Sequence, residues 1–132
     1  LNKAGNASSK EHIAIINKAI SIIGKENIIG ILGDREFASG RLFKWINSKK
    51  LYFYIRIKDN SEVKIGKKKL CSAKKLFRHL NLREQSIFGC TVWIYGQKVY
   101  LAGSRSHTGE LMVVATNKCD KNAIAVYLRR WE

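Results

Sequence analysis

The chain has 132 residues, 45% hydrophobic and 27% charged, which is the composition of an ordinary globular domain or a large part of one. Its longest apolar stretches are too short to cross a bilayer, so no membrane protein is expected. Twenty-five Lys and Arg against ten Asp and Glu give a net charge of +15, which indicates a polyanionic partner. Nucleic acid is the first candidate, an anionic membrane surface the second, and basic charge without such a partner is the remaining alternative.

The three cysteines, Cys71, Cys90 and Cys119, are widely spaced and include no Cys-x-x-Cys pair. This pattern predicts reduced, buried thiols in a cytoplasmic protein rather than disulfides or a zinc site.

The first part of the chain begins with a predicted strand end and a turn at residues 5–6. Ser8 or Ser9 can then cap a helix, in which isoleucines recur at helical spacing until Gly24 ends it. The continuous apolar run of residues 28–32 predicts a short strand buried on both faces, as in the middle of an α/β sheet.

A second helix is expected from about Ser39, with Leu42, Phe43, Trp45 and Ile46 inward, followed by a strand over residues 51–58. Helix, buried strand, helix and strand in this order predict an α/β fold. Residues 1–60 are therefore interpreted as one core segment.

Residues 61–118 differ in composition and are interpreted as a β-rich insertion. The stretch 61–82 is basic and weakly periodic, residues 87–102 predict a hairpin with its turn near Gly96, and residues 110–116 predict one more strand. Residues 119–132 return to a helical pattern, for which Asp120 can serve as the N-cap.

Asp34 is the leading candidate for chemistry. It comes directly after the predicted buried strand, where α/β sheets place their active sites. The alternative is that Asp34 only caps the next helix or closes a turn. Glu36, two residues on, either faces the same cleft or is a solvated acid in the first turn of a helix, and we favour the second interpretation.

Three segments together carry a resemblance to a known family. The stretch ILGDREFASGRLFKWINSKKLYFYIRIKDN resembles the region around the second catalytic aspartate of DDE transposases of bacterial insertion sequences, of the type often called "IS-four". The opening LNKAGNASSKEHIAIINKAI resembles the segment before that aspartate. The closing YLRRWE resembles the start of the family's Tyr-x-x-Arg-x-x-x-Glu motif.

This resemblance implies a partial ribonuclease H-like core, a mixed sheet with flanking helices, interrupted by the insertion. It implies two Mg²⁺ ions, or Mn²⁺, held by an Asp, Asp, Glu trio, because two cations stabilise the attacking and leaving oxygens of a phosphodiester. Asp34 matches the second member of the trio and is the predicted catalytic and metal-binding residue.

Tyr127 and Arg130 match the first two letters of the closing motif, and the resemblance implies that they contact the DNA backbone. The alternative is a helix with a core tyrosine and a solvated arginine. Arg56 is a further DNA-binding candidate on grounds of charge. Trp93, in the predicted hairpin, can stack on an unpaired base or can be an ordinary cross-strand residue.

The resemblance places the trio's first aspartate before Leu1 and its glutamate two positions beyond Glu132, so the segment is expected to be inactive alone. DNA is the implied partner, at transposon ends and target, with a homodimer on paired ends. The competing hypothesis is a non-catalytic basic nucleic-acid-binding module, including a decayed transposase remnant.

Overall fold

The computed structural model describes residues 4–67 and 69–129. The α-helices among these residues are α1 (Ala4–Ile23), α2 (Gly40–Ser48) and α3 (Ala123–Leu128). Short 3₁₀ helices are η1 (Lys25–Asn27), η2 (Arg35–Phe37) and η3 (Ala73–Phe77). The strands are β1 (Ile31–Gly33), β2 (Phe53–Ile57), β3 (Glu62–Ile65), β4 (Lys69–Ser72), β5 (Gln85–Ile87), β6 (Val92–Ile94), β7 (Gln97–Arg105) and β8 (Leu111–Thr116).

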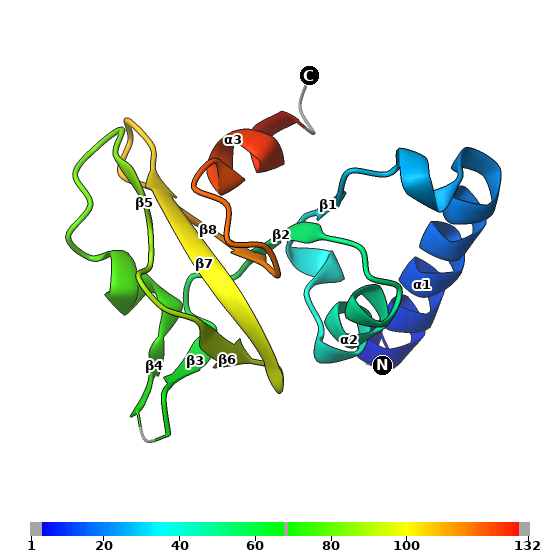
Figure 1. The fold of residues 1–132 in the computed structure, drawn as a ribbon. Coiled ribbons are helices and arrows are strands. Elements are labelled where there is room, and N and C mark those ends of the chain that lie inside the picture. Colours follow the sequence, from blue (N-terminus) through cyan, green and yellow to red (C-terminus); the bar gives the residue numbers. More distant parts are fainter. Residues whose placement is uncertain (1–3, 68, 130–132) are drawn as a thin grey trace.

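The strands form one mixed sheet in the order β1-β2-β8-β7-β6-β3-β4, and β5 also pairs with β7 (Figure 1). β1 and β2 run parallel, with Ile31 opposite Phe53 and Gly33 opposite Ile55. The other pairings among the described strands are antiparallel. The segment with α2 forms the crossover that a parallel pair requires. The predicted α/β class is therefore confirmed.

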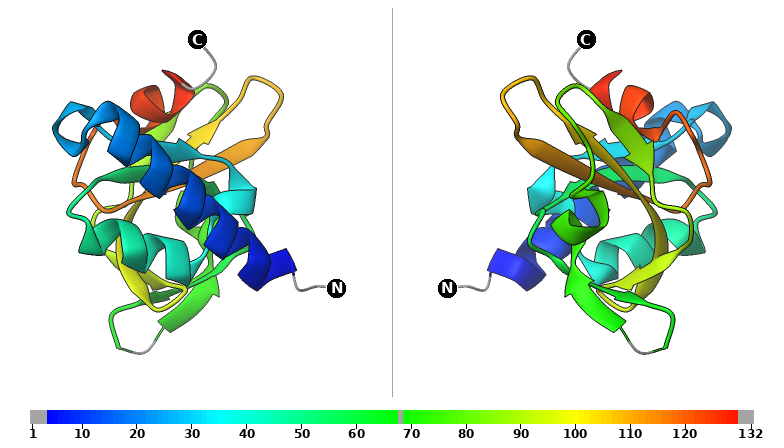
Figure 2. Two further views of the ribbon diagram at one scale, coloured as in Figure 1. Left: turned by 90° about the vertical axis from the view of Figure 1, so that its right-hand side faces the viewer. Right: turned by 90° about the vertical axis from the view of Figure 1, so that its left-hand side faces the viewer.

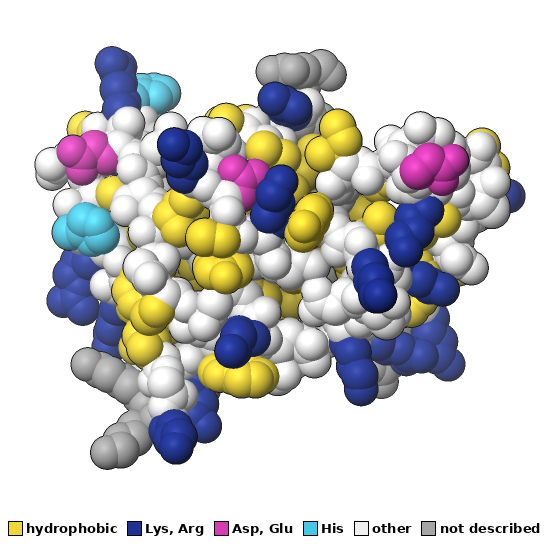
Figure 3. Space-filling view, in the orientation of Figure 1, with side chains coloured by type: hydrophobic (Ala, Val, Ile, Leu, Met, Phe, Trp, Pro, Cys, Tyr) yellow, Lys and Arg dark blue, Asp and Glu magenta, His cyan; other side chains and the backbone are white. Residues whose placement is uncertain are grey.

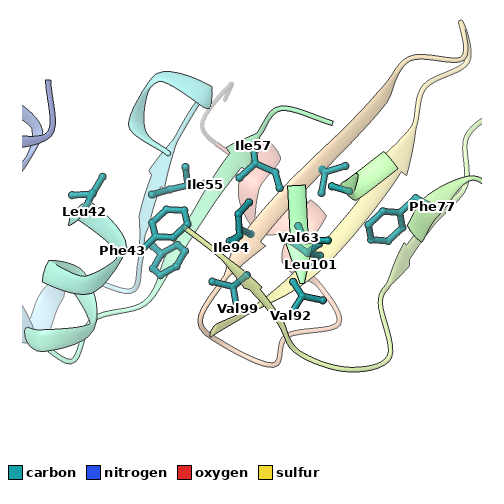
Figure 4. Close-up of a cluster of buried hydrophobic side chains, with 14 of the residues drawn as sticks. Leu42, Phe43, Ile55, Ile57, Val63, Phe77, Val92, Ile94, Val99 and Leu101 are labelled. Carbon is teal, nitrogen blue, oxygen red and sulfur yellow. The ribbon is translucent and has the colours of Figure 1, made fainter. Parts of the chain in front are cut away.

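Helices cover both faces of β2. On one face, α1 and α2 join a core that extends through β2, β6, β7 and β8 as far as Phe77 of η3 (Figure 4). In the left panel of Figure 2, α1 crosses the molecule diagonally on this side. On the other face, Ile124 and Tyr127 of α3 pack with Tyr54 of β2. Because strand side chains alternate between faces, β2 contributes to both cores.

The beginning of α1 corrects the sequence prediction. Residues 5–9 lie inside the helix rather than in a turn and a cap. The Ser9 side chain is buried, and its Oγ lies 3.1 Å from Oγ of Ser39, so Ser9 joins α1 to the residue that precedes α2. The predicted strand end before it lies outside the described residues. The predicted stop at Gly24 is confirmed, since this residue follows α1 with a φ of 92°.

β1 is also a correction. The strand is shorter than the run of residues 28–32, and it occupies the edge of the described sheet rather than its middle. The backbone N–H of Ile28 donates to the Lys25 carbonyl and closes η1, while the side chain of Ile29 is 79% exposed. Continuous hydrophobicity cannot distinguish a strand with two neighbours from a turn that leads into a strand with one.

The helix and strand that follow β1 agree with their predictions. Ser39 is the N-cap of α2, accepting from the Leu42 N–H at 3.1 Å, and Leu42, Phe43 and Ile46 are fully buried. Gly40 begins α2 directly against the β6–β7 turn, where a Cβ would overlap the carbonyl oxygen of Tyr95. The absence of a side chain at Gly40 lets the helix approach this closely.

The predicted hairpin and the strand over residues 110–116 are confirmed as β6, β7 and β8, with Tyr95 and Gly96 at the turn. The predicted cap of the last helix is wrong. Asn122 precedes α3, while Asp120 accepts from the Asn122 N–H at 2.8 Å and so closes the turn before the helix.

The three cysteines are free, as predicted, but they are not buried. Cys90 and Cys119 are exposed and Cys71 is half-buried. Among the described residues, no helix has both the length and the apolar character needed to span a bilayer.

Candidate functional site

Asp34 lies in a tight turn that its neighbours hold in place. Its carbonyl accepts from the Phe37 N–H at 3.0 Å, and its Oδ1 accepts from the Glu36 N–H at 3.1 Å. The Phe37 ring stacks on His12 of α1, with 3.8 Å between centroids, and a Cβ at Gly33 would lie 3.0 Å from Phe37. Contacts on both sides of Asp34 therefore fix the position of its half-buried carboxylate at the end of β1.

Both interpretations of Asp34 find support in this geometry. Asp34 is the N-cap of η2, as the alternative predicts, and it also stands at the carboxyl end of a strand, as the catalytic hypothesis requires. The side chain of Glu36 is exposed, which agrees with a solvated acid. Capping occupies one oxygen of Asp34 with a backbone donor, and a carboxylate can accept further interactions at both oxygens.

The register places Asp34 beside Arg56. Gly33, the last residue of β1, is paired with Ile55, so a continuation of this register would put the next residue, Asp34, opposite Arg56 at the strand spacing of about 5 Å. Leu32, two residues before Asp34, packs in the same cluster as Tyr127, which puts this end of β1 next to α3 despite its edge position. The carboxyl ends of β1 and β2 and the start of β8 lie together at one end of the strands. We call this end the sheet edge at Asp34, as distinct from the lateral edge that β1 forms.

Arg56 is held incompletely. Its Nη2 lies 3.4 Å from Oε2 of Glu110, in an ion pair whose side chains are 22% and 73% exposed respectively. Its Nε is buried and has no hydrogen-bond partner among the described residues. The buried Nε is out of reach of a ligand, but the Nη groups carry further donors that can bind a second anionic partner.

Tyr127 lies in the core, 1% exposed, where it packs with Tyr54. This is the position that the core interpretation predicts, while its contact with DNA stays a prediction. The Tyr54 hydroxyl donates to Oδ2 of Asp120 at 2.8 Å and ties β2 to the turn before α3. Arg130 lies outside the described residues.

In the Tyr54–Asp120 pair, the pKa of the tyrosine is raised and the pKa of the aspartate is lowered. The hydrogen bond from the Asn122 N–H is the largest cause that lowers the pKa of Asp120; burial opposes it, and the Tyr54 hydroxyl and nearby Lys118 lower the pKa further. Burial, and then the hydrogen bond to Asp120, raise the pKa of Tyr54. At neutral pH the pair is therefore a phenol donating to a carboxylate.

Trp93 stands on an exposed surface of the hairpin. It is 44% exposed and lies between two lysines, being paired with Lys64 of β3 and Lys98 of β7. The Lys98 Nζ lies 5.9 Å from the ring centroid. We call this group, with the 45% exposed Tyr95, the hairpin surface. Its flat aromatic face and flanking cations suit a nucleic-acid base and its phosphate.

The described residues do not by themselves fit a two-metal site. No group of three or more His, Cys, Asp or Glu side chains among them could hold a metal ion. Asp34 has Glu36 nearby, but the latter points to solvent. The role of Asp34 as a metal ligand therefore stays a prediction.

The sequence analysis missed a basic cavity at the same edge of the sheet as Asp34. Four basic side chains line it, with Asp59 and Glu110: Lys74, Lys75, Arg78 and Arg105. The signal was present in the run KKLFRH, although its weak periodicity gave no hint that distant Arg105 completes the group. Elsewhere, Lys and Arg side chains are scattered over the surface, and acidic side chains are few on the face in Figure 3.

Comparison with known families gives one clear result. The family described as "Transposase DDE domain" matches residues 3–131, almost the whole chain. No curated protein and no solved structure matches the chain significantly. The mixed sheet with flanking helices is consistent with the ribonuclease H-like fold of such domains. On the extent of this match, the chain belongs to the transposase DDE domain family.

Proposed function

We propose that this chain is a segment of the catalytic domain of a DNA transposase of the IS-four type, which cleaves DNA at transposon ends and transfers the strands to a target. The observation that carries the proposal is the carboxylate of Asp34, fixed at the carboxyl end of β1 within the family match. A basic protein of net charge +15 suits such a substrate.

In the proposal, Asp34 is a catalytic residue and a ligand for Mg²⁺, or Mn²⁺. Such an ion, when bound, stabilises negative charge on phosphodiester oxygens. The contribution of this chain is to hold the carboxylate still, through the Glu36 N–H and the Phe37–His12 stack, so that little reorganisation is needed on binding.

For the DNA contacts, we propose different roles for the candidate residues. Arg56, one strand from Asp34, binds a phosphate near the reacting bond with the Nη donors that Glu110 leaves free. Trp93 stacks on an unpaired base. Tyr127 is buried against Tyr54, so its proposed role is to position α3 on β2. The DNA contact proposed for it rests on the resemblance, because a buried side chain does not reach DNA in this conformation. For Arg130 the proposed phosphate contact rests on the resemblance.

The catalytic role is tested by Asp34→Asn in the intact transposase. Removing one metal-binding carboxylate costs several kcal/mol of transition-state stabilisation, so we expect a loss of about 10³-fold or more in Mg²⁺-dependent cleavage of transposon-end DNA. DNA affinity should change little, because one charge among many is altered.

The matched control is Glu36→Gln, which removes the same charge two residues away from an exposed position. It should retain cleavage within a few-fold. An Asp34→Asn enzyme that cleaves as fast as the Glu36→Gln enzyme would remove the site assignment.

For the organisation of the domain, we propose that residues 1–60 and 119–132 belong to the ribonuclease H-like core and that residues 61–118 are an insertion. The insertion would be firmly joined to the core, since β8 pairs with β2 along four residues. The resemblance assigns the other two carboxylates to positions outside these residues. We therefore propose that the segment alone does not cleave DNA, and that the intact enzyme works as a homodimer on paired ends, in the cytoplasm at the nucleoid.

The second candidate is a non-catalytic basic module that binds nucleic acid. The net charge of +15 and the exposed lysines beside Trp93 support it, because they suit a polyanion without any bound metal. This module would bind DNA with a steep salt dependence and without any effect of Mg²⁺ beyond ionic strength. Binding to transposon-end DNA that tightens with Mg²⁺ in wild type and not in Asp34→Asn would favour the transposase.

A further inference from the structure

The basic cavity is a built feature at the functional edge of the sheet. It has a volume of about 470 Å³ and is bounded by η3, the end of β7 and the start of β8. β7 ends and β8 begins at the edge where β1 ends, so the cavity and Asp34 open at the same edge, two strands apart. Four of its charged lining side chains are basic and two are acidic.

The floor of the cavity is rigid because Arg105 is clamped. Its Nε donates to the Leu80 carbonyl at 2.9 Å, its Nη1 to the Gly109 carbonyl at 2.9 Å and its Nη2 to the Phe77 carbonyl at 3.3 Å. A guanidinium carries five N–H donors, so two remain after these bonds. Arg105 is thus a positive charge at a fixed place with donors to spare.

The basic wall is anchored as well. The backbone N–H of Lys74 donates to the Asp59 carbonyl at 2.8 Å, and that of Ala73 donates to the Ser61 carbonyl at 2.8 Å. Phe77, on the inner side of η3, is fully buried. These bonds orient η3 so that the exposed side chains of Lys74, Lys75 and Arg78 surround the opening.

Glu110 connects the cavity to Arg56. Its carboxylate lines the cavity and is also the partner of Arg56 at 3.4 Å. This contact is long and the Glu110 side chain is 73% exposed, so the ion pair is weak and Glu110 is easily displaced. Glu110 therefore lies between Arg56 and the basic side chains of the cavity. Its negative charge occupies a position that would attract another anion.

We propose that this cavity is a subsite for a backbone phosphate of DNA, on a path that runs from Asp34 past Arg56 to Lys74, Lys75, Arg78 and Arg105. Glu110 competes with DNA for Arg56 and weakens binding until phosphate displaces it. The inference rests on the proposed function, because it assigns the route of the DNA substrate beyond the reacting bond.

The experiment measures the affinity of the protein for a labelled duplex across a series of KCl concentrations. The double variant Lys74→Gln/Lys75→Gln is expected to bind about tenfold more weakly at low salt. The slope of log K against log[KCl] should become shallower by about one to two, because each lost phosphate contact reduces the slope by about 0.9. Glu110→Gln should bind about two- to fivefold more tightly.

The matched control is Lys10→Gln/Lys18→Gln, which removes the same charge from exposed positions of α1. A loss of affinity and of slope equal to that of the cavity variant would overturn the subsite and leave DNA binding in place. Unchanged or weaker binding by Glu110→Gln would overturn the competition. Wild-type protein that does not bind DNA at all would overturn both this inference and the proposed function.

Discussion

The sheet edge at Asp34 and the hairpin surface both present cations, but they hold them differently. At the edge, Arg105 is fixed by three backbone carbonyls, and Arg56 is held by Glu110. On the hairpin surface, Lys98 lies over the exposed ring of Trp93, and no carboxylate or carbonyl in the described part of the chain fixes its ammonium group.

This difference separates two kinds of recognition. A clamped guanidinium offers its remaining donors in one geometry, which suits a phosphate that must be placed accurately relative to a carboxylate. An exposed lysine beside a flat ring tolerates many positions of a base, which suits binding without strict register. We therefore expect the edge to position DNA for chemistry and the hairpin surface to hold it.

The largest expected effect comes from breaking the core that both regions share. Phe43 is fully buried, stacks on Phe53 at 4.3 Å between centroids and contacts the Tyr95 ring at 5.9 Å. Phe43→Ala should lower the free energy of unfolding by about 3–5 kcal/mol, measured by urea denaturation. It should weaken duplex and single-strand binding together, because both regions rest on this packing.

Lys44→Ala, at an exposed position of the same helix, is its control and should change stability by less than about 0.5 kcal/mol. If Phe43→Ala disturbed only one kind of binding, the two regions would be mechanically independent and the shared-core interpretation would be wrong.

Trp93→Ala sharpens the comparison further. Loss of one stacked base should weaken binding of a single-stranded oligonucleotide by about 5- to 150-fold, the equivalent of about 1–3 kcal/mol. Fluorescence anisotropy should show an unchanged salt slope, because no charge is removed. Trp93→Phe should recover most of the affinity.

Tyr52 is a matched control for Trp93. It is 45% exposed and has the Lys118 Nζ at 5.1 Å from its ring centroid. It directly precedes β2, so it lies at the opposite end of the strands from Asp34. Equal losses from Tyr52→Ala and Trp93→Ala would show that exposed aromatic area, rather than the hairpin surface, governs binding.

The smallest expected effect concerns the tie between β2 and α3. Tyr54→Phe removes the hydrogen bond to Asp120 and should cost about 1 kcal/mol of stability at neutral pH. Because folding lowers the pKa of Asp120, its stabilisation is complete above the unfolded pKa of about 3.9 and is lost as the pH falls through the lower folded value.

Urea unfolding at pH 6 and in steps below pH 4 should therefore show wild type converging on Asp120→Asn as acid is added. A constant gap between the two proteins across this range would mean that the carboxylate of Asp120 is not stabilised by folding.

Local patterns predicted the elements that local forces determine. The cap at Ser39 and the inward residues of α2 follow from side-chain chemistry and helical spacing, and both are found as expected. The start of α1 was mispredicted because Ser9 turns inward to Ser39, thirty residues away, and this contact outweighs the usual preference of serine for caps.

The candidate site shows the same limit. Asp34 was chosen as a candidate from its position after an apolar run, but the edge location of β1 depends on which strands are neighbours. The cavity combines Arg105 with Lys74, and only the pairing of β7 with β8 and the anchoring of η3 bring them together. Such proximity is a property of topology, which hydrophobic periodicity does not contain.

Gly40 restricts which residue can occupy this position of the fold. The crossover that carries Asp34 and the turn that carries Tyr95 touch backbone to backbone there, with no room for even a methyl group. Substituting alanine would push the two apart and change the span over which a single DNA molecule could engage both. The distance between the two regions therefore depends on the absence of a Cβ at Gly40, a residue that is not among the proposed DNA contacts.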